Sequence, residues 1–209
     1  MRSFIPDEYV LGKAKFYGQD FFVSPDVLIP RVETEEIIDI VCHPAGWRGL
    51  IADVGTGSGC IGITLGHKFP QATVYLSDIS DKALEIARKN ATQEIILKSN
   101  LLENYPDILF DVIVANLPYI PTKRILRLLA AVRKYEPILA LDGGPKGTTI
   151  INRLLSQLPK YLKPTGIAIL EIDDTHTLKS FKIPKVFKAE IKKDQFGRNR
   201  FLILHADVV

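Results

Sequence analysis

The sequence IADVGTGSG, residues 51–59, decides the fold of this chain because it carries a buried strand directly into a glycine-rich turn. Glycine lets the backbone turn sharply and approach a ligand closely. The helix expected next, over residues 60–68, offers the free N–H groups of its first turn to the crevice above the strand. This order of elements is typical of open sheets that bind a ligand at the carboxyl ends of their strands.

Outward from this turn, short apolar runs alternate with helical patterns, which predicts an α/β fold with a doubly wound parallel sheet. We expect strands at residues 50–54, 73–77, 94–98, 111–115 and 166–172. Helices are expected at residues 60–68, 81–91 and 148–162, the second with a cap at Ser80 or Asp81. The segments 186–192 and 200–205 predict a terminal antiparallel pair, residues 20–27 are partly strand-like, and residues 33–42 are helical.

The composition is that of a globular protein, with 209 residues of which 46% are hydrophobic and 24% charged. A formal net charge of +3 is too small to indicate nucleic-acid binding by itself. Two cysteines without a pairing pattern fit a reducing compartment. No apolar run reaches the roughly 18 residues that span a bilayer, and the start of the chain does not resemble a secretion signal. We therefore expect a soluble, cytoplasmic protein with no membrane partner.

Two acidic residues near the turn indicate which ligand it holds. Asp78 ends the second strand, 19 residues after Gly59, where a carboxylate accepts hydrogen bonds from both hydroxyls of a ribose. The glycines also satisfy the dinucleotide fingerprint, so the turn alone leaves NAD and S-adenosylmethionine both open. Asp53 favours S-adenosylmethionine, because its carboxylate repels a pyrophosphate and attracts the ammonium group of methionine. A structural turn, with Asp78 as a helix-capping acid, is the alternative.

The tetrapeptide Asn116-Leu117-Pro118-Tyr119 follows the fourth strand, which should end beside the first. An amide nitrogen is a poor nucleophile, and acceptors for its N–H groups orient it and raise its electron density. Asn116 Oδ1 and a backbone carbonyl can do this, while Pro118 stiffens the loop and Tyr119 offers a flat face. Catalysis would then consist mainly of positioning for in-line displacement, without a metal. A turn with Tyr119 packed in the core is the alternative.

These motifs together resemble those of class I methyltransferases that act on nitrogen, and more narrowly the release-factor glutamine methyltransferases (the HemK/PrmC family). The resemblance extends over residues 9–204, and its outer strings are unusual enough to make it specific. It is carried by residues 16–18 with 28–35, 53–59, 116–119 and 136–144.

The resemblance implies a Rossmann-like sheet of seven strands with the last antiparallel, S-adenosylmethionine as methyl donor and S-adenosylhomocysteine as product. It implies methylation of the side-chain N5 of glutamine in the Gly-Gly-Gln loop of class I peptide chain release factors, which would tune translation termination. We expect one compact, monomeric domain, in which residues 1–49 complete the substrate side and residues 50–209 form the cofactor-binding core.

Carried over by position, the resemblance also implies a set of site residues. The cofactor would contact Asp53, Gly55, Thr56, Gly57, Ser58, Gly59, Asp78, Asn100, Leu101 and Asn116. The glutamine would lie against Asn116, Leu117, Pro118 and Tyr119, with Arg31 and Glu33 bracing that loop. The catalytic residues among these are Asn116, Pro118 and Tyr119.

The chain departs from the family pattern at several positions. Leu117 replaces a proline, and Asn-Leu-Pro-Tyr is typical of ribosomal RNA adenine dimethyltransferases. Asn100 replaces an acidic residue, although its amide oxygen can still accept a proton from the adenine amino group. Leu101 replaces an aromatic residue of some relatives. The helical N-terminal domain of many bacterial relatives has no counterpart in the sequence, so docking is expected to rely on the catalytic domain or to be weaker.

Other functions remain open from the sequence. One is an adenine N6-methyltransferase acting on RNA or DNA, another a non-catalytic module that binds S-adenosylmethionine, and the least favoured a nicotinamide oxidoreductase. The basic stretch of residues 123–134 is interpreted as a solvated helix face with Leu126, Leu128 and Leu129 inward. Its alternative is a contact surface for an acidic or RNA-bound partner.

Overall fold

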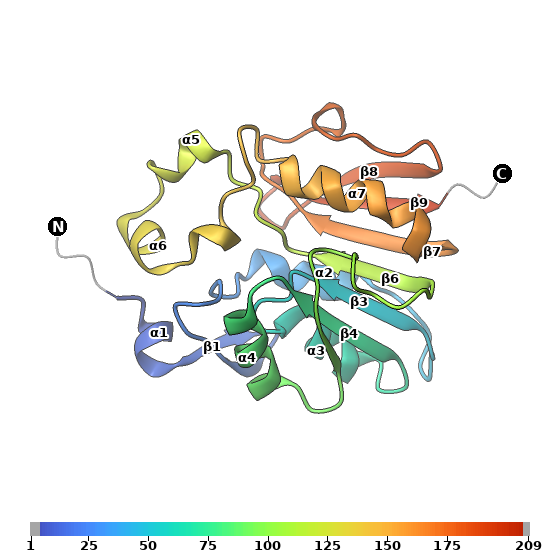
Figure 1. Ribbon diagram of the computed structural model, residues 1–209, viewed down its shortest axis with the longest axis horizontal. Helices are drawn as coiled ribbons and strands as arrows, with labels where there is room; N and C mark the ends of the chain where they lie inside the picture. The colour runs from blue at the N-terminus through green and yellow to red at the C-terminus, as the bar shows by residue number, and fades with distance from the viewer. Residues whose placement is uncertain (1–4, 207–209) are drawn as a thin grey trace.

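A seven-stranded sheet forms the centre of the protein, whose computed structural model describes residues 5–206 (Figure 1). The strands lie in the order β5-β4-β3-β6-β7-β9-β8, and β9 runs antiparallel to its neighbours while the others are parallel. Their bounds are β3 (Leu50–Val54), β4 (Thr73–Asp78), β5 (Ile95–Lys98), β6 (Phe110–Ala115), β7 (Leu162–Glu171), β8 (Phe187–Lys193) and β9 (Asn199–Ala206). The expected α/β sheet with a reversed last strand is confirmed.

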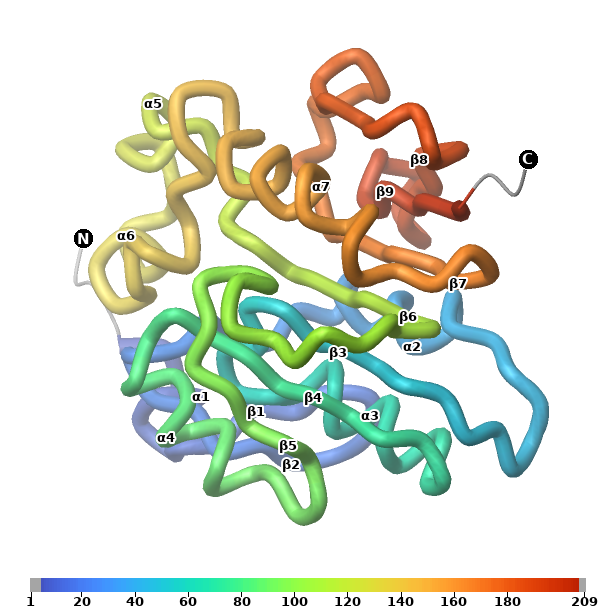
Figure 2. Tube along the Cα trace, turned by 45° about the vertical axis from the view of Figure 1, so that its right-hand side comes forward, coloured from blue at the N-terminus to red at the C-terminus, as the bar shows by residue number. Residues whose placement is uncertain are grey.

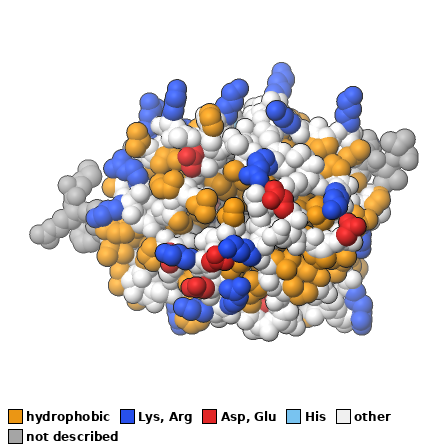
Figure 3. Space-filling model, viewed as in Figure 1, with side chains coloured by type: hydrophobic (Ala, Val, Ile, Leu, Met, Phe, Trp, Pro, Cys, Tyr) orange, Lys and Arg blue, Asp and Glu red, His pale blue; other side chains and the backbone are white. Residues whose placement is uncertain are grey.

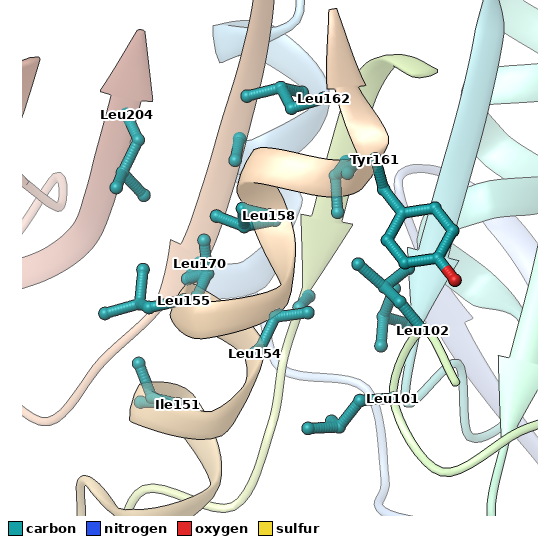
Figure 4. Packing of buried hydrophobic residues seen from close by; sticks show 14 of the residues in the cluster. Leu101, Leu102, Ile151, Leu154, Leu155, Leu158, Tyr161, Leu162, Leu170 and Leu204 are labelled. Atoms are coloured by element: carbon teal, nitrogen blue, oxygen red, sulfur yellow. The ribbon is translucent and has the colours of Figure 1, made fainter. Parts of the chain in front are cut away.

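Helices cover both faces of this sheet. The helix α7 packs on one face and points a stripe of aliphatic side chains at it (Figure 4). The helices α2 and α3 pack on the other face. The aliphatic stripe consists of Ile151, Leu154, Leu155 and Leu158. The bounds of these helices, with α4, are α2 (Glu36–Ile40), α3 (Cys60–Lys68), α4 (Asp81–Asn90) and α7 (Thr149–Tyr161).

The helix α4 begins where the sequence places its cap, because Ser80 Oγ accepts a hydrogen bond from Ala83 N. An N-terminal unit packs against this helix: α1 (Asp7–Leu11) leads into a hairpin of β1 (Lys13–Phe16) and β2 (Gln19–Phe22). The strand expected over residues 20–27 is therefore shorter, and the helix expected over residues 33–42 divides into η1 (Glu33–Glu35) and α2.

The segment between β6 and α7 differs most from expectation. It holds two short helices, α5 (Thr122–Ile125) and α6 (Ala130–Tyr135), followed by the short 3₁₀ helix η2 (Ile138–Ala140). The single helix expected over residues 123–134 is interrupted between α5 and α6, so the helical spacing of its leucines does not place them on one buried face. Leu126 and Leu129 are 75% and 78% exposed. The interpretation that these leucines face inward is wrong for both.

The α5–α6 segment lies on the same side of the molecule as α1, as the two views agree (Figures 1 and 2). The turn η3 (Leu178–Ser180) completes the elements of the described residues. None of the helices in residues 5–206 has the length and apolarity needed to span a lipid bilayer.

Candidate active site

The glycine turn and the tetrapeptide meet at the carboxyl edge of the sheet. The strands β3 and β6 are hydrogen-bonded neighbours with Val54 opposite Ala115, so the turns that follow them are adjacent. Gly57 and Asn116 line the same cavity, whose volume is about 420 Å³. A cavity of this size falls in the range typical of sites for small molecules, and we call it the larger cavity.

The glycine turn is shaped by three left-handed backbone conformations. Gly55, Gly57 and Gly59 have φ angles of 73°, 56° and 87°, which residues with a side chain rarely adopt. The turn is held to the end of β4, because Gly55 N donates to Ser77 O at 2.8 Å and Gly57 N donates to Asp78 Oδ2 at 3.0 Å. The glycines therefore bring the backbone next to the acid that the sequence assigned to a ribose.

Asp53 is fully buried at the foot of this turn. Its Oδ2 accepts hydrogen bonds from Thr56 Oγ1 at 2.6 Å and from Gly62 N at 2.9 Å. Its Oδ1 has no hydrogen-bond partner within residues 5–206. Burial raises the pKa of Asp53 to about 6, so its negative charge is poorly stabilised by the protein alone. A cationic group in the neighbouring cavity would compensate for this.

Asp78 lies on the wall of the larger cavity. One carboxylate oxygen accepts from Gly57 N and the other from Ser80 N at 2.9 Å, while burial raises the pKa of the carboxyl group. The exposed Ile79 follows it and lines the same cavity. A carboxylate and an apolar side chain from consecutive residues thus both line this wall.

Asn100 and Leu101 form another part of the wall. Asn100 Nδ2 donates to the two carboxylate oxygens of Glu103 at 3.1 and 3.2 Å. Leu101 is buried and has a φ of 58°, a conformation that costs energy for a residue with a side chain. The turn therefore holds Leu101 against the cavity at the expense of local strain.

A second, smaller cavity of about 190 Å³ adjoins the larger one and shares Asn116 with it as a lining residue. Arg31, Tyr119 and Leu128 contribute to its wall, and Asn116 lines both cavities. Asn116 therefore borders two cavities, the larger one lined also by the glycine turn and the smaller one by the segment that carries α5 and α6.

The buried carboxylate of Glu171, at the end of β7, organises the polar groups around Asn116. Glu171 Oε2 accepts from Thr34 Oγ1 at 2.6 Å and from Asn116 Nδ2 at 3.1 Å. Its Oε1 accepts from Tyr119 Oη at 2.8 Å. Burial raises the pKa of Glu171, and burial together with this carboxylate raises that of Tyr119 well above its ordinary value. Tyr119 is consequently a neutral hydroxyl donor.

The tetrapeptide is braced from behind by the unusual string of residues 136–144. Ile120 N donates to Leu141 O at 3.1 Å, and Gly143 N donates to Ile120 O at 2.9 Å. A Cβ on Gly143 would lie 2.7 Å from Pro118 O, which leaves no room for a side chain. The backbone of residues 136–144 therefore runs next to the backbone of the tetrapeptide.

Arg31 and the string are joined by an ion pair. A guanidinium nitrogen of Arg31 contacts Glu136 Oε1, and only 1% of the Glu136 side chain is exposed. The contact fixes the end of α6 against the N-terminal segment. Burial raises the pKa of Glu136, and the charge of Arg31 opposes that shift.

The structure separates the predicted site residues into three groups. The larger cavity is lined by Gly55, Gly57, Asp78, Asn100, Leu101, Asn116, Leu117 and Pro118, and the smaller by Arg31, Asn116 and Tyr119. Neither cavity is lined by Asp53, Thr56, Ser58, Gly59 or Glu33.

Sequence reasoning missed Thr34, Glu171 and Ile79. Thr34, and not Glu33, contacts Asn116, with Nδ2 donating to Oγ1 at 3.2 Å. A signal for Glu171 did exist, because it is the only carboxylate in the apolar run of residues 166–172 and an unpaired buried charge is costly. Ile79 could have been found as the residue that directly follows Asp78.

Comparison with known proteins shows which family this chain resembles. Residues 35–132 match the model of the Methyltransferase small domain. A release factor glutamine methyltransferase of Koribacter versatilis is 42% identical over 80% of this chain and 62% of its own length. The enzyme of the same name from Moorella thermoacetica is 37% identical over 96% of this chain and 75% of its own length. A crystal structure of a methyltransferase from Pyrococcus furiosus has a TM-score of 0.66 at 20% identity, covering 92% of this chain and 91% of that one.

The coverage differs among these relatives. The chain spans about three fifths of the Koribacter versatilis protein and of a relative from Geobacter sulfurreducens, 62% and 60% respectively. It spans three quarters of the Moorella thermoacetica protein. The likeness to the solved structure supports the fold alone, whereas the sequence identity over most of the chain confirms the resemblance seen in the motifs. The chain belongs to the release factor glutamine methyltransferase family.

Proposed function

We propose that this chain transfers a methyl group from S-adenosylmethionine to the side-chain N5 of the glutamine in the Gly-Gly-Gln loop of class I peptide chain release factors. The observation that carries the proposal is the place of Asn116, a residue that lines both cavities. A donor in the larger cavity and an acceptor in the smaller one would meet beside this residue. Family membership supports the choice of donor and acceptor.

The residues of the larger cavity fit the proposed cofactor. The carboxylate of Asp78 suits ribose hydroxyls, and Ile79 and Leu101 give apolar walls for the adenine ring. The unpaired Oδ1 of Asp53 leaves a negative charge that an ammonium group would stabilise, although Asp53 does not line the cavity. We include Thr56, Ser58 and Gly59 in the proposed cofactor site as residues that shape the turn.

The proposed chemistry depends on orientation. S-adenosylmethionine would supply a sulfonium methyl group that is open to in-line displacement by a nitrogen lone pair. The N–C bond forms as the C–S bond breaks, S-adenosylhomocysteine is the leaving group, and the nitrogen gives up one N–H proton to water. Asn116 Oδ1 accepts a hydrogen bond from the acceptor N–H and so turns the nitrogen toward the donor. Pro118 keeps the loop rigid, and the ring of Tyr119 supports the planar carboxamide of the substrate. Most of the rate enhancement then comes from proximity and alignment.

The surface beside the smaller cavity suits a protein partner. Figure 3 shows hydrophobic and basic side chains intermixed over the part of the surface where Figure 1 places α5 and α6. Leu126 and Leu129 are largely exposed there, and no ion pair of Lys123 or Arg127 is found within residues 5–206. Aliphatic groups next to unpaired cations are suited to a protein surface that carries apolar and acidic residues.

Methyl transfer to purified release factor tests the proposal. Labelled S-adenosylmethionine is incubated with the enzyme and with release factors that carry glutamine or asparagine in the Gly-Gly-Gln loop. We expect label in the first protein and none in the second, and mass spectrometry should place one methyl group on the glutamine. Label in neither protein, or equal label in both, contradicts the proposal. We propose further that the protein is a cytoplasmic monomer. Size-exclusion chromatography tests whether it is monomeric.

A second candidate is an adenine N6-methyltransferase acting on RNA or DNA. Leu117 favours it, and so do Lys123 and Arg127, two cations of residues 123–134 for which no ion pair is found within residues 5–206. It predicts tight nucleic-acid binding that weakens steeply as salt rises. Label in nucleic acid but not in release factor would replace the first proposal with this one, and cofactor binding without transfer to any acceptor would leave a non-catalytic module.

A further inference from the structure

The orientation of the Asn116 carboxamide is fixed by two acceptors. Asn116 Nδ2 donates to Glu171 Oε2 at 3.1 Å and to Thr34 Oγ1 at 3.2 Å. The hydroxyl proton of Thr34 is already donated to Glu171 Oε2 at 2.6 Å, so this hydroxyl can only accept from Asn116. A carboxylate has no proton to donate. Both neighbours can therefore only accept a hydrogen bond from the carboxamide, which places its nitrogen, and not its oxygen, against them.

The other end of the carboxamide remains free for a ligand. No hydrogen bond to Asn116 Oδ1 is found within the described part of the chain. An asparagine flipped by 180° has nearly the same shape, but it would place its oxygen against the carboxylate and its NH₂ group toward the cavities. An NH₂ group there would face the NH₂ group of an amide substrate, where neither can accept.

We propose that Glu171 is a positioning residue that holds Asn116 Oδ1 toward the acceptor nitrogen, an assignment that rests on the proposed function. Glu171 acts through Asn116 and touches no substrate itself, since it is 1% exposed and lines neither cavity. It also fixes Tyr119, whose hydroxyl donates to Oε1 at 2.8 Å. One carboxylate at the end of β7 thereby sets the orientation of both polar residues of the tetrapeptide.

The substitution Glu171→Gln separates orientation from shape. Glutamine fills the same space but carries an NH₂ group, and when that group faces Asn116 it favours the flipped carboxamide. We expect kcat to fall about 10- to 100-fold, as small misplacements of reacting groups do. The dissociation constant for S-adenosylmethionine and the KM for release factor should change little, because neither cavity loses a wall residue.

One further variant repeats the test at Thr34, and two others serve as controls. Thr34→Val removes the second acceptor at nearly constant volume and should lower kcat, whereas Thr34→Ser keeps the hydroxyl and should preserve it. Asp111→Asn removes another carboxylate of the sheet, at the far end of β6, where it accepts from Leu50 N and Lys163 Nζ. We expect that variant to keep its kcat, which shows that loss of a carboxylate elsewhere in the sheet is not sufficient.

A measurement without substrate distinguishes failure of this assignment from failure of the proposed function. The side-chain NH₂ resonances of Asn116, assigned by their loss in Asn116→Asp, should shift or split into two sets in Glu171→Gln and stay in place in Asp111→Asn. Unchanged resonances, or a kcat within twofold of the wild type, would overturn the positioning role. Absence of glutamine methylation in the wild type would reject the proposed function, while the resonances would still decide the orientation.

Discussion

Gly147 lies directly against the backbone of Tyr119. A Cβ on Gly147 would sit 2.1 Å from the Tyr119 carbonyl oxygen, and Gly147 has a φ of 72°. The chain that leads into α7 therefore touches the tetrapeptide backbone to backbone. Any side chain at position 147 must displace the loop that carries Asn116 and Tyr119.

The substitution Gly147→Ala should for this reason lower both stability and kcat. The left-handed conformation alone costs alanine about 1 kcal/mol, and the clash with Tyr119 O adds to it. Gly12→Ala is the matched control, because Gly12 has a φ of 67° and open space around its Cβ position. Urea unfolding should show a larger loss for Gly147→Ala than for Gly12→Ala, and equal losses would contradict the close approach.

Burial of Asp53 makes the stability of the ligand-free protein depend on pH. Its pKa is raised to about 6 in the folded state, compared with about 3.9 in an unfolded chain. The folded state therefore holds more protons between these values, and stability falls as pH rises from about 4 to about 6. Ionisation of Asp53 costs about 3 kcal/mol at pH 7.

The substitution Asp53→Asn removes this dependence. Urea unfolding of both proteins without cofactor should show wild type gaining stability relative to the variant as pH is lowered from 7 to 5. Because an ammonium ligand favours the ionised form, affinity of the wild type for S-adenosylmethionine should weaken below pH about 6. Parallel stability curves for the two proteins would show that Asp53 does not titrate in this range.

The fold could be predicted because its determinants are local. The glycine turn, the cap at Ser80 and the alternation of apolar runs each act over a few residues, and α3 begins and ends where its pattern does. The segment of residues 122–140 could not be predicted, since its leucines follow a helical spacing that the break between α5 and α6 interrupts. A local pattern of leucines does not show where a helix is interrupted.

The site could be predicted only in part, for a related reason. Gly57 and Asn116 follow two strands and Asp78 ends a third, and the carboxyl ends of these strands meet, so strand order alone brings the three residues together. Thr34 and Glu171 are 137 residues apart, and their contact depends on how the N-terminal segment crosses the end of β7. Their side chains become neighbours through packing that no single motif specifies.

The ion pair between Arg31 and Glu136 should contribute to stability mainly by compensating a buried charge. The Arg31 side chain is 34% exposed and that of Glu136 is 1% exposed. Arg31→Met leaves the carboxylate unpaired and should destabilise the protein by about 3–5 kcal/mol. Adding Glu136→Gln to this variant should restore part of the loss.

A double-mutant cycle by urea unfolding measures the coupling of the two residues. Lys15→Met is the control, because Lys15 pairs with Asp20 on the surface and its loss should change stability little. Additive effects of Arg31→Met and Glu136→Gln would mean that the pair is not coupled.

The exposed leucines of the α5–α6 segment should contribute to partner binding and not to folding. Leu126→Ser and Leu129→Ser together remove apolar surface that is already in solvent, at 75% and 78% exposure, so unfolding should change by less than about 1 kcal/mol. If release factor docks there, its KM should rise about tenfold or more, as loss of a central apolar contact does at protein interfaces.

The matched control is Leu109→Ser, an exposed leucine that precedes β6 and lies at the opposite edge of the sheet from the site. It should leave the KM for release factor unchanged. Affinity for S-adenosylmethionine should be the same in all these variants, because none of the three leucines lines the larger cavity. An unchanged KM in the double variant, or an equal rise in Leu109→Ser, would place the docking surface elsewhere, since apolar area lost from an interface must weaken the complex that buries it.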